Sequence, residues 1–196
     1  MYDNDLIAAK LRRWDTYLAK YRLPDWEAIP DIGLYMEQVV TVLKQYLDYL
    51  PPELKDEQFI TASTINNYVR TKVMPMPVKK KYYRTHLAYL IMICSLKQGL
   101  SISLIQKLIP SDLPEEELKR VYSAYAERHR LATRYFADQV RDAAAPFLGH
   151  ASSPSALVTD RPEDMIAASA VVGAFGRLFA EKLLLLEGKT LEEETT

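Results

Sequence analysis

Residues 59–109, FITASTINNYVRTKVMPMPVKKKYYRTHLAYLIMICSLKQGLSISLIQKLI, decide the fold because they combine a short helix, a basic loop and two further helices. Between positions 58 and 111 the chain holds eight Lys or Arg residues and no Asp or Glu. Since all 196 residues carry 25 basic and 26 acidic side chains, the remainder holds 17 basic and 26 acidic ones. The net charge of −1 therefore conceals a strongly positive segment, and the local field governs the binding of an anionic partner.

Capping residues and prolines predict the elements of this stretch. A short helix through Ile65 follows hydroxyl side chains that can cap it, namely Thr61, Ser63 and Thr64. The Pro-Met-Pro sequence at 75–77 excludes a helix and a central strand, which predicts an extended loop or an edge ribbon. Residues 84–98 are apolar on most sides and predict a central buried helix, and Ser101 or Ser103 can cap a last short helix.

Periodic apolar residues predict amphipathic helices on either side of this centre. One spans residues 4–21, and a second spans residues 31–50 with Asp31 as its N-cap. A long helix is predicted over residues 114–145, because proline and three glutamates fill its first turn. A final helix over residues 163–187 completes a C-terminal helical hairpin. No internal repeat and no alternating strand pattern is present, so the predicted fold class is all-α.

The lysine triplet at 79–81 is read together with its neighbours. It follows the proline-restricted loop and comes shortly after a helix that carries Asn66 and Asn67. Lysines on a loop can hold phosphates, and an Asn side chain can form a bidentate pair with adenine in the major groove. This combination predicts nucleic-acid binding rather than a merely solvated basic surface. The candidate DNA-binding residues are Ser63, Thr64, Asn66, Asn67, Tyr68, Arg70, Lys72, Lys79, Lys80, Lys81, Tyr82 and Arg84.

The order of these motifs resembles the DNA-binding domain of MerR-like winged helix-turn-helix regulators. The resemblance is carried by TASTINNYV at 61–69, VMP at 73–75, Tyr82 with Leu87, and QGLSI at 98–102 followed by Ile105. More narrowly, residues 23–109 resemble a bacterial family of YkrK-type proteins known mainly as a domain of unknown function, through IPDIGLYMEQV, INNYV and PVKKKY…HLAYL.

The resemblance implies a sequence-specific transcription regulator. Its recognition helix would span residues 63–70 and its wing would carry the lysines at 79–81. This chain departs from the MerR-like pattern at Asn66 and Asn67, where arginine and tyrosine are usual, and at Tyr83, where a helix-capping serine is common. The predicted domains are a helical DNA-binding domain over residues 1–112, with its helix-turn-helix at about 59–109, and a C-terminal helical hairpin over residues 113–196 for dimerisation or effector binding.

Enzymatic and metal sites are not predicted. None of the three histidines, His86, His129 and His150, has a His, Cys or carboxylate at a metal-ligand spacing, and no glycine-rich phosphate loop or nucleophile elbow is present. We expect His86 to be a satisfied or phosphate-facing side chain rather than a catalyst. Cys94 has no cysteine partner and lies in an apolar run, which predicts a buried thiol in a reducing compartment. No cofactor is expected.

The expected partners are double-stranded DNA and a second copy of the chain, because one helix-turn-helix contacts one half-site. The alternative is a non-enzymatic helical interaction module with an acidic protein partner, and a weaker one is an unidentified small-molecule effector held by the C-terminal hairpin. The aromatic residues of that hairpin are more simply explained by core packing. The N-terminus lacks a signal core and no apolar stretch is long enough to span a bilayer, so we expect a cytoplasmic protein with no membrane contact.

Overall fold

The computed structural model describes residues 3–48, 60–143, 167–168, 170–178, 186 and 188–190. The ordered elements within these ranges are helices, and they contain no strand beyond two isolated bridges. The prediction of an all-α fold is confirmed for them. The elements are α1 (Asn4–Lys20), the 3-10 helix η1 (Trp26–Ala28), α2 (Met36–Tyr46), α3 (Ala62–Arg70), α4 (Arg84–Leu96), α5 (Ile102–Leu108) and α6 (Glu115–Ala143). Residues 167–168 and 170–178 are also helical.

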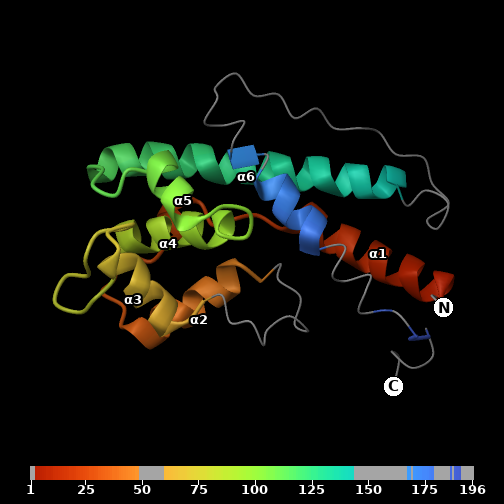
Figure 1. The fold of residues 1–196 in the computed structure, drawn as a ribbon, viewed down its shortest axis with the longest axis horizontal. Helices are drawn as coiled ribbons and strands as arrows, with labels where there is room; N and C mark the ends of the chain where they lie inside the picture. The colour runs from red at the N-terminus through yellow and green to blue at the C-terminus, as the bar shows by residue number, and fades with distance from the viewer. Residues whose placement is uncertain are drawn as a thin grey trace.

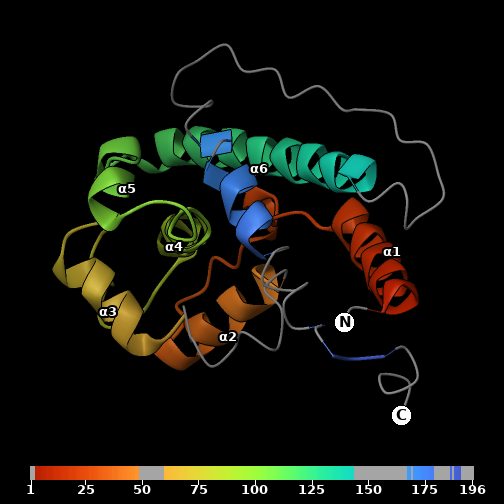
Figure 2. The ribbon, with the colours of Figure 1, turned by 45° about the vertical axis from the view of Figure 1, so that its right-hand side comes forward.

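Helix α4 is the centre of the molecule. Every residue from His86 to Leu96 is buried, as expected for a helix that is apolar on most sides. Figure 2 views α4 nearly along its axis, with α2, α3, α5 and α6 arranged around it. Its one large polar side chain in mid-helix, Tyr89, donates its hydroxyl to the Pro110 carbonyl at 2.9 Å. The predicted central helix is therefore confirmed, and it fixes where α3 and α5 lie.

Helices α1 and α6 pack against each other beside this centre, as Figure 1 shows. The rings of Trp14 and Phe136 meet edge to face with centroids 5.6 Å apart, and Arg141 pairs with Asp15 at 2.7 Å. The C-terminal helical residues join the same core, because Phe175 stacks on Phe136 at 5.5 Å. The described helical residues between 167 and 178 thus pack within their own chain. One hydrophobic core runs from residue 14 to residue 178 and includes α1, α4 and α6.

The inner face of α6 carries Leu118, Tyr125, Ala132 and Phe136, which are all buried. Val121 is partly buried against the same core, and the side chain of Val140 lies outside the described part. Among the aromatic residues expected to pack rather than line a cavity, Tyr122 and Phe175 are fully buried.

The prediction for the second helix is wrong at its start. Helix α2 begins at Met36, and the preceding residues are extended because Leu34 exchanges backbone hydrogen bonds of 2.9 Å with Tyr82. The cap is supplied by Gln38, whose Oε1 accepts from the Tyr35 amide at 2.9 Å. Asp31 caps nothing here; its carboxylate lies 4.0 Å from Arg84 Nη1. The bridge between Leu34 and Tyr82 keeps the residues before Met36 extended, so the helix starts five residues later than predicted.

Several sequence predictions lie outside the described residues. These are residues 144–145 of the predicted long helix, parts of the final helix predicted over 163–187, and His150. The second helix ends at Tyr46, four residues before its predicted end at residue 50. Within the described part, no helix combines the length and apolar character needed to cross a membrane.

Candidate nucleic-acid interface

The segment after α3, residues 73–83, forms a tight hairpin that we call the wing. It is the loop that leaves α3 at the left edge of Figure 1. Val78 and Lys81 exchange both backbone hydrogen bonds, at 3.0 and 2.9 Å, and only Lys79 and Lys80 lie between them. Both lysines have positive φ, 49° and 63°, which defines a two-residue turn of the I′ type. The expected edge ribbon is confirmed, with two exposed lysines at its tip.

The wing has an inner and an outer face. Leu34 and Tyr82 are directly paired, so their side chains share one face, and both are buried. Neighbours along each strand point the other way. Lys81 therefore lies on the outer face, where its Nζ is 5.4 Å from the centre of the Tyr35 ring. A Cβ on Gly33 would stand 2.6 Å from Lys81 Cδ, so this glycine lets the lysine cross the strand beside it.

Helix α3 is bounded by two well-formed caps. Thr61 is the N-cap residue, and its hydroxyl accepts from the Thr64 amide at 3.0 Å. At the other end the Val73 amide donates to Tyr68 O and the Lys72 amide donates to Val69 O, which is the Schellman arrangement. Lys72 occupies the left-handed position of that motif with φ 58°, where glycine is usual. Of the three N-caps considered, only Thr61 has this role.

The solvent face of α3 carries three of the predicted contact residues. Ser63, Asn66 and Arg70 are exposed and spaced by three and four positions, which places them on one side of the helix. Asn67 is half-buried, and its Oδ1 accepts from Arg70 Nη2 at 2.7 Å. Thr64 is also half-buried, with its hydroxyl 2.8 Å from that of Thr61. The exposed face thus offers an amide, a hydroxyl and a guanidinium to a ligand.

The prediction that Tyr68 and Tyr82 contact DNA is wrong for this conformation, because both side chains are 3% exposed. Tyr68 lies three positions after Ile65 and shares its buried face, against α4 and the core. Burial raises the pKa of the Tyr68 hydroxyl far above its usual value, and the neighbouring Cys94 thiol adds to this effect. The pKa of Tyr82 is raised by burial as well. These tyrosines fix the helix and the wing to the core.

The side chain of Arg84 is bonded within its own chain and links two segments of the fold. Its Nε donates to the Ile29 carbonyl at 2.9 Å, and its guanidinium carbon lies 6.0 Å from the centre of the Trp26 ring. Together with the approach of Asp31 described above, these contacts join the start of α4 to residues 26–31. Arg84 is therefore held by its own chain with its side chain 22% exposed, and a phosphate contact by its remaining N–H groups stays a prediction.

His86 ties the wing to the start of α4. Its Nδ1 accepts from the Tyr83 amide at 3.1 Å, and its Nε2 lies 3.0 Å from the Met76 carbonyl. A ring nitrogen that accepts from an amide carries no proton, so Nε2 is the protonated nitrogen and donates to Met76. His86 is a satisfied, buried side chain and does not face a phosphate. It also supplies the helix cap that a serine at position 83 would otherwise provide.

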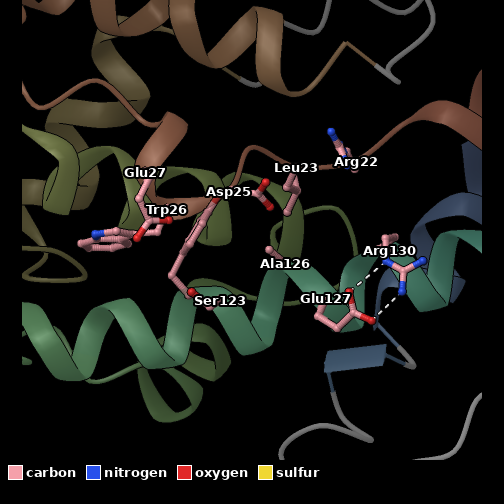
Figure 3. Close-up of a pocket in the computed structure, with 10 residues that line it drawn as sticks. Arg22, Leu23, Asp25, Trp26, Glu27, Ser123, Ala126, Glu127 and Arg130 are labelled. Carbon is pink, nitrogen blue, oxygen red and sulfur yellow. Dashed lines mark hydrogen bonds and ion pairs between the residues drawn. The ribbon is translucent and has the colours of Figure 1, made fainter.

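A separate groove of about 390 Å³ lies between residues 22–27 and α6. Figure 3 shows Arg130 turned toward Glu127 across one turn of α6, with hydrogen bonds of 2.9 and 2.6 Å. Those hydrogen bonds lower the pKa of Glu127, and a hydrogen bond from Lys119 lowers that of Glu27. The acidic side chains of the groove are thus mostly paired with neighbouring cations, and no set of acid, base and nucleophile converges there. We assign it no reaction.

Metal-ligating and reactive groups are not assembled in the described part of the chain. Its His, Cys, Asp and Glu residues form no group of three that could hold a metal ion. Cys94 is buried, as predicted, and burial raises the pKa of its thiol to about 12, which keeps it protonated. The candidate site is therefore the exposed side of α3 together with the wing.

Sequence reasoning missed three features of this site. The first is the left-handed conformation of Lys72, Lys79 and Lys80, since neither glycine nor asparagine marks these positions. The second is the pairing of residues 33–35 with the wing. The third is the exposure of Met76 and Val78, which are 76% and 54% exposed. A signal for the last was present, because the flanking prolines hold these side chains on an edge ribbon.

Comparison with known proteins places the chain in a family but attaches no function to it. The family model described as Domain of unknown function (DUF1836) matches residues 24–126, which span η1 through the first part of α6 and include the whole candidate site. No curated protein and no solved structure matches this chain significantly. Because the match covers more than half of its length, the chain belongs to the DUF1836 family.

Proposed function

We propose that this chain is a DNA-binding transcriptional regulator of the MerR-like winged helix-turn-helix type, acting as a homodimer and without catalysis, metal or cofactor. Helix α3 would enter a major groove and the wing would hold flanking phosphates. The observation that carries the proposal is the division of cations within residues 58–111. Arg84 is hydrogen-bonded to its own chain, whereas Arg70, Lys72, Lys79 and Lys80 are exposed, as is the amide side chain of Asn66 on α3.

The surface chemistry supports this proposal over a general basic surface. Amide and guanidinium groups on one helix face can read base edges, and lysines on an adjoining loop can follow the backbone. The stretch from 58 to 111 has no carboxylate that could neutralise them internally. A two-fold pair would present two such surfaces to two half-sites, which is the usual route to specificity.

The test is selection from a random duplex pool by the full chain, followed by fluorescence anisotropy on the enriched duplex at several salt concentrations. We expect salt-sensitive, sequence-preferring binding, with a log-log slope near −0.9 for each phosphate held. Removing two lysines, Lys79→Ala with Lys80→Ala, should reduce the slope by about 1.8 per bound chain.

A matched control is Arg12→Ala with Arg13→Ala. It removes the same charge from exposed positions of α1, which lies across the molecule from α3 in Figures 1 and 2. Equal loss of binding in both variants would mean that net charge, not this site, governs association. A chain that binds no duplex but captures an acidic protein through the same lysines would support the interaction-module alternative.

A further inference from the structure

A second groove, of about 580 Å³, lies between the end of α1, the segment 22–28 and the end of α2. Its lining residues all precede residue 49, so it is separate from the C-terminal hairpin. Its volume falls within the range of small-molecule sites, which is about 300–1,000 Å³. The walls and the charged side chains of this groove indicate which kind of molecule fits it.

The walls of the groove are aromatic and are held by hydrogen bonds between its elements. Tyr17 and Tyr21 stack with their ring centroids 5.8 Å apart. Tyr21 donates its hydroxyl to the Tyr46 carbonyl at 2.7 Å, which links α1 to α2, and the Tyr46 hydroxyl lies 3.4 Å from the Ala28 carbonyl. The buried side chain of Leu23 adds apolar surface. A flat apolar group can therefore pack against rings that are already in place.

Charged side chains of both signs line the groove. Lys20 and Arg22 stand at and just after the end of α1, Asp25 follows them, and Asp48 lies just after α2. None of these four side chains forms an ion pair or a hydrogen bond within the described part of the chain. The groove of Figure 3, by contrast, contains an ion pair on α6. Cations and carboxylates that are not paired with each other are available to the opposite charges of one ligand.

A positive charge on the ligand is favoured at the helix ends. Both α1 and α2 end at the groove, and the last carbonyl groups of a helix carry partial negative charge. Burial raises the pKa of the Tyr17 hydroxyl and the charge of Asp48 raises it further, so this carboxylate acts on the aromatic wall itself. An ammonium group is also attracted to the faces of tyrosine rings.

A negative charge on the ligand is matched by the two cations. In Figure 3 the side chain of Arg22 leaves its segment on the side away from α6, and it is exposed, as is Lys20. A guanidinium group can hold a carboxylate through two parallel hydrogen bonds.

We propose that this groove binds an aromatic amino acid in its zwitterionic form. The ring would stack on the tyrosine wall, the ammonium group would lie between the helix ends and Asp48, and the carboxylate would meet Lys20 and Arg22. A molecule of one sign only would leave one pair of charged side chains unmatched. The site is independent of the proposed DNA binding, since its lining residues lie outside α3 and the wing.

The test is a titration of the full chain with L-phenylalanine and two matched analogues, followed by NMR of the backbone amides. Phenethylamine keeps the ring and the ammonium group but lacks the carboxylate, whereas 3-phenylpropionate keeps the carboxylate and lacks the ammonium group. We expect saturable shifts of the amides around the groove. L-phenylalanine should bind about fivefold more tightly than either analogue, which is the upper end for one exposed ion pair.

Two variants assign the ligand charges to their partners. Arg22→Gln should weaken the binding of L-phenylalanine and 3-phenylpropionate and leave that of phenethylamine unchanged. Asp48→Asn should weaken the binding of L-phenylalanine and phenethylamine and leave that of 3-phenylpropionate unchanged. Both positions are exposed, so folding should be retained. Arg12→Gln, at an exposed position of α1 outside the lining of the groove, is the matched control and should bind all three compounds as the parent does.

Three results would overturn the proposal. They are the absence of shifts at about 10 mM L-phenylalanine, shifts confined to residues outside the groove, and phenethylamine bound as tightly as L-phenylalanine with no effect of Arg22→Gln. The last result would assign the groove to organic cations. DNA binding is measured separately on duplexes, so its failure and the failure of this site are distinguishable.

Discussion

Replacing the two tip lysines of the wing with Asn-Gly, as Lys79→Asn with Lys80→Gly, should stabilise the protein and weaken its binding to DNA. Both lysines occupy the left-handed region, at φ 49° and 63°. This conformation costs an ordinary residue roughly 1–2 kcal/mol, whereas Asn-Gly is the preferred pair for this turn. Glycine also loses more backbone conformational freedom on folding than other residues do, which reduces the gain in stability by about 0.5–1 kcal/mol.

Relief at both positions is worth about 2–4 kcal/mol, so the net gain expected for the pair is about 1–3 kcal/mol in the free energy of unfolding after the glycine offset is subtracted. For a chain of this size that corresponds to a rise in Tm of about 2–12 °C. DNA affinity should move the other way. Each phosphate contact adds about 0.9 to the slope of log K against log salt, so two lost contacts change it by about 1.8. If the variant and the parent bind equally at about 1 M salt, the variant should bind roughly 60-fold more weakly than the parent at about 0.1 M.

The matched control is Lys79→Ala with Lys80→Ala, because alanine removes the charge and keeps the backbone penalty. It should lose DNA affinity as the Asn-Gly variant does and gain little or no stability. Urea denaturation and fluorescence anisotropy, measured on the same samples, separate the two effects. An Asn-Gly variant that is no more stable than the parent, or that binds DNA as tightly, would refute the view that strain is retained here for the sake of the lysine side chains.

Three further predictions concern the fold around the site. Arg84→Lys should lower the free energy of unfolding by about 1–3 kcal/mol in urea titrations, since the charged hydrogen bond to Ile29 O is lost. A variant that is as stable as the parent and defective only in DNA binding would contradict this structural role of Arg84. Gly99→Ala should lower the free energy of unfolding by about 1–3 kcal/mol, because its Cβ would stand 2.9 Å from the backbone oxygen of Ala170. Gly33→Ala should lower it less, because its Cβ meets the flexible side chain of Lys81. Equal losses for the two variants in urea titrations would contradict this contrast. Burial lowers the pKa of His129 to about 4, so the unfolded chain binds a proton that the folded chain does not; stability should be full above about pH 6.5 and decline by about 3 kcal/mol as the pH falls to about 4. His129→Leu should flatten that part of the pH profile, and an unchanged slope would argue against the assignment.

The helices and their order could be predicted from sequence because local signals agree with the tertiary structure. The even apolar coverage of residues 84–98 placed α4 at the centre, and the hydroxyl side chains of Thr61, Ser63 and Thr64 marked the region where α3 starts. Proline at 75 and 77 predicted an extended loop or an edge ribbon. Each of these signals acts within one turn or one strand, so no distant contact was needed to interpret it.

The roles of individual side chains at the site depend on contacts that sequence does not display. Arg84 reaches a carbonyl 55 positions away, and nothing near it distinguishes a brace from a phosphate ligand. Asp31 has the form of an N-cap, but pairing of Leu34 with Tyr82 extends the chain past it. Tyr68 is different, because its spacing of three from the apolar Ile65 already indicated the buried face, but its neighbours Asn67 and Arg70 led us to count it among the DNA contacts.

A second argument for the proposed function comes from where the backbone is strained. Lys72, Lys79 and Lys80 are the non-glycine residues with positive φ in the described part of the chain, and all three lie in the segment without carboxylates. At each position glycine or asparagine would relieve the strain without disturbing a buried side chain, since all three lysines are exposed. Such strain persists where a side chain is required for another reason, and its sites cluster at ligand contacts. Three exposed cations held in this way therefore support the proposal of an anionic partner, independently of any resemblance between this chain and other proteins.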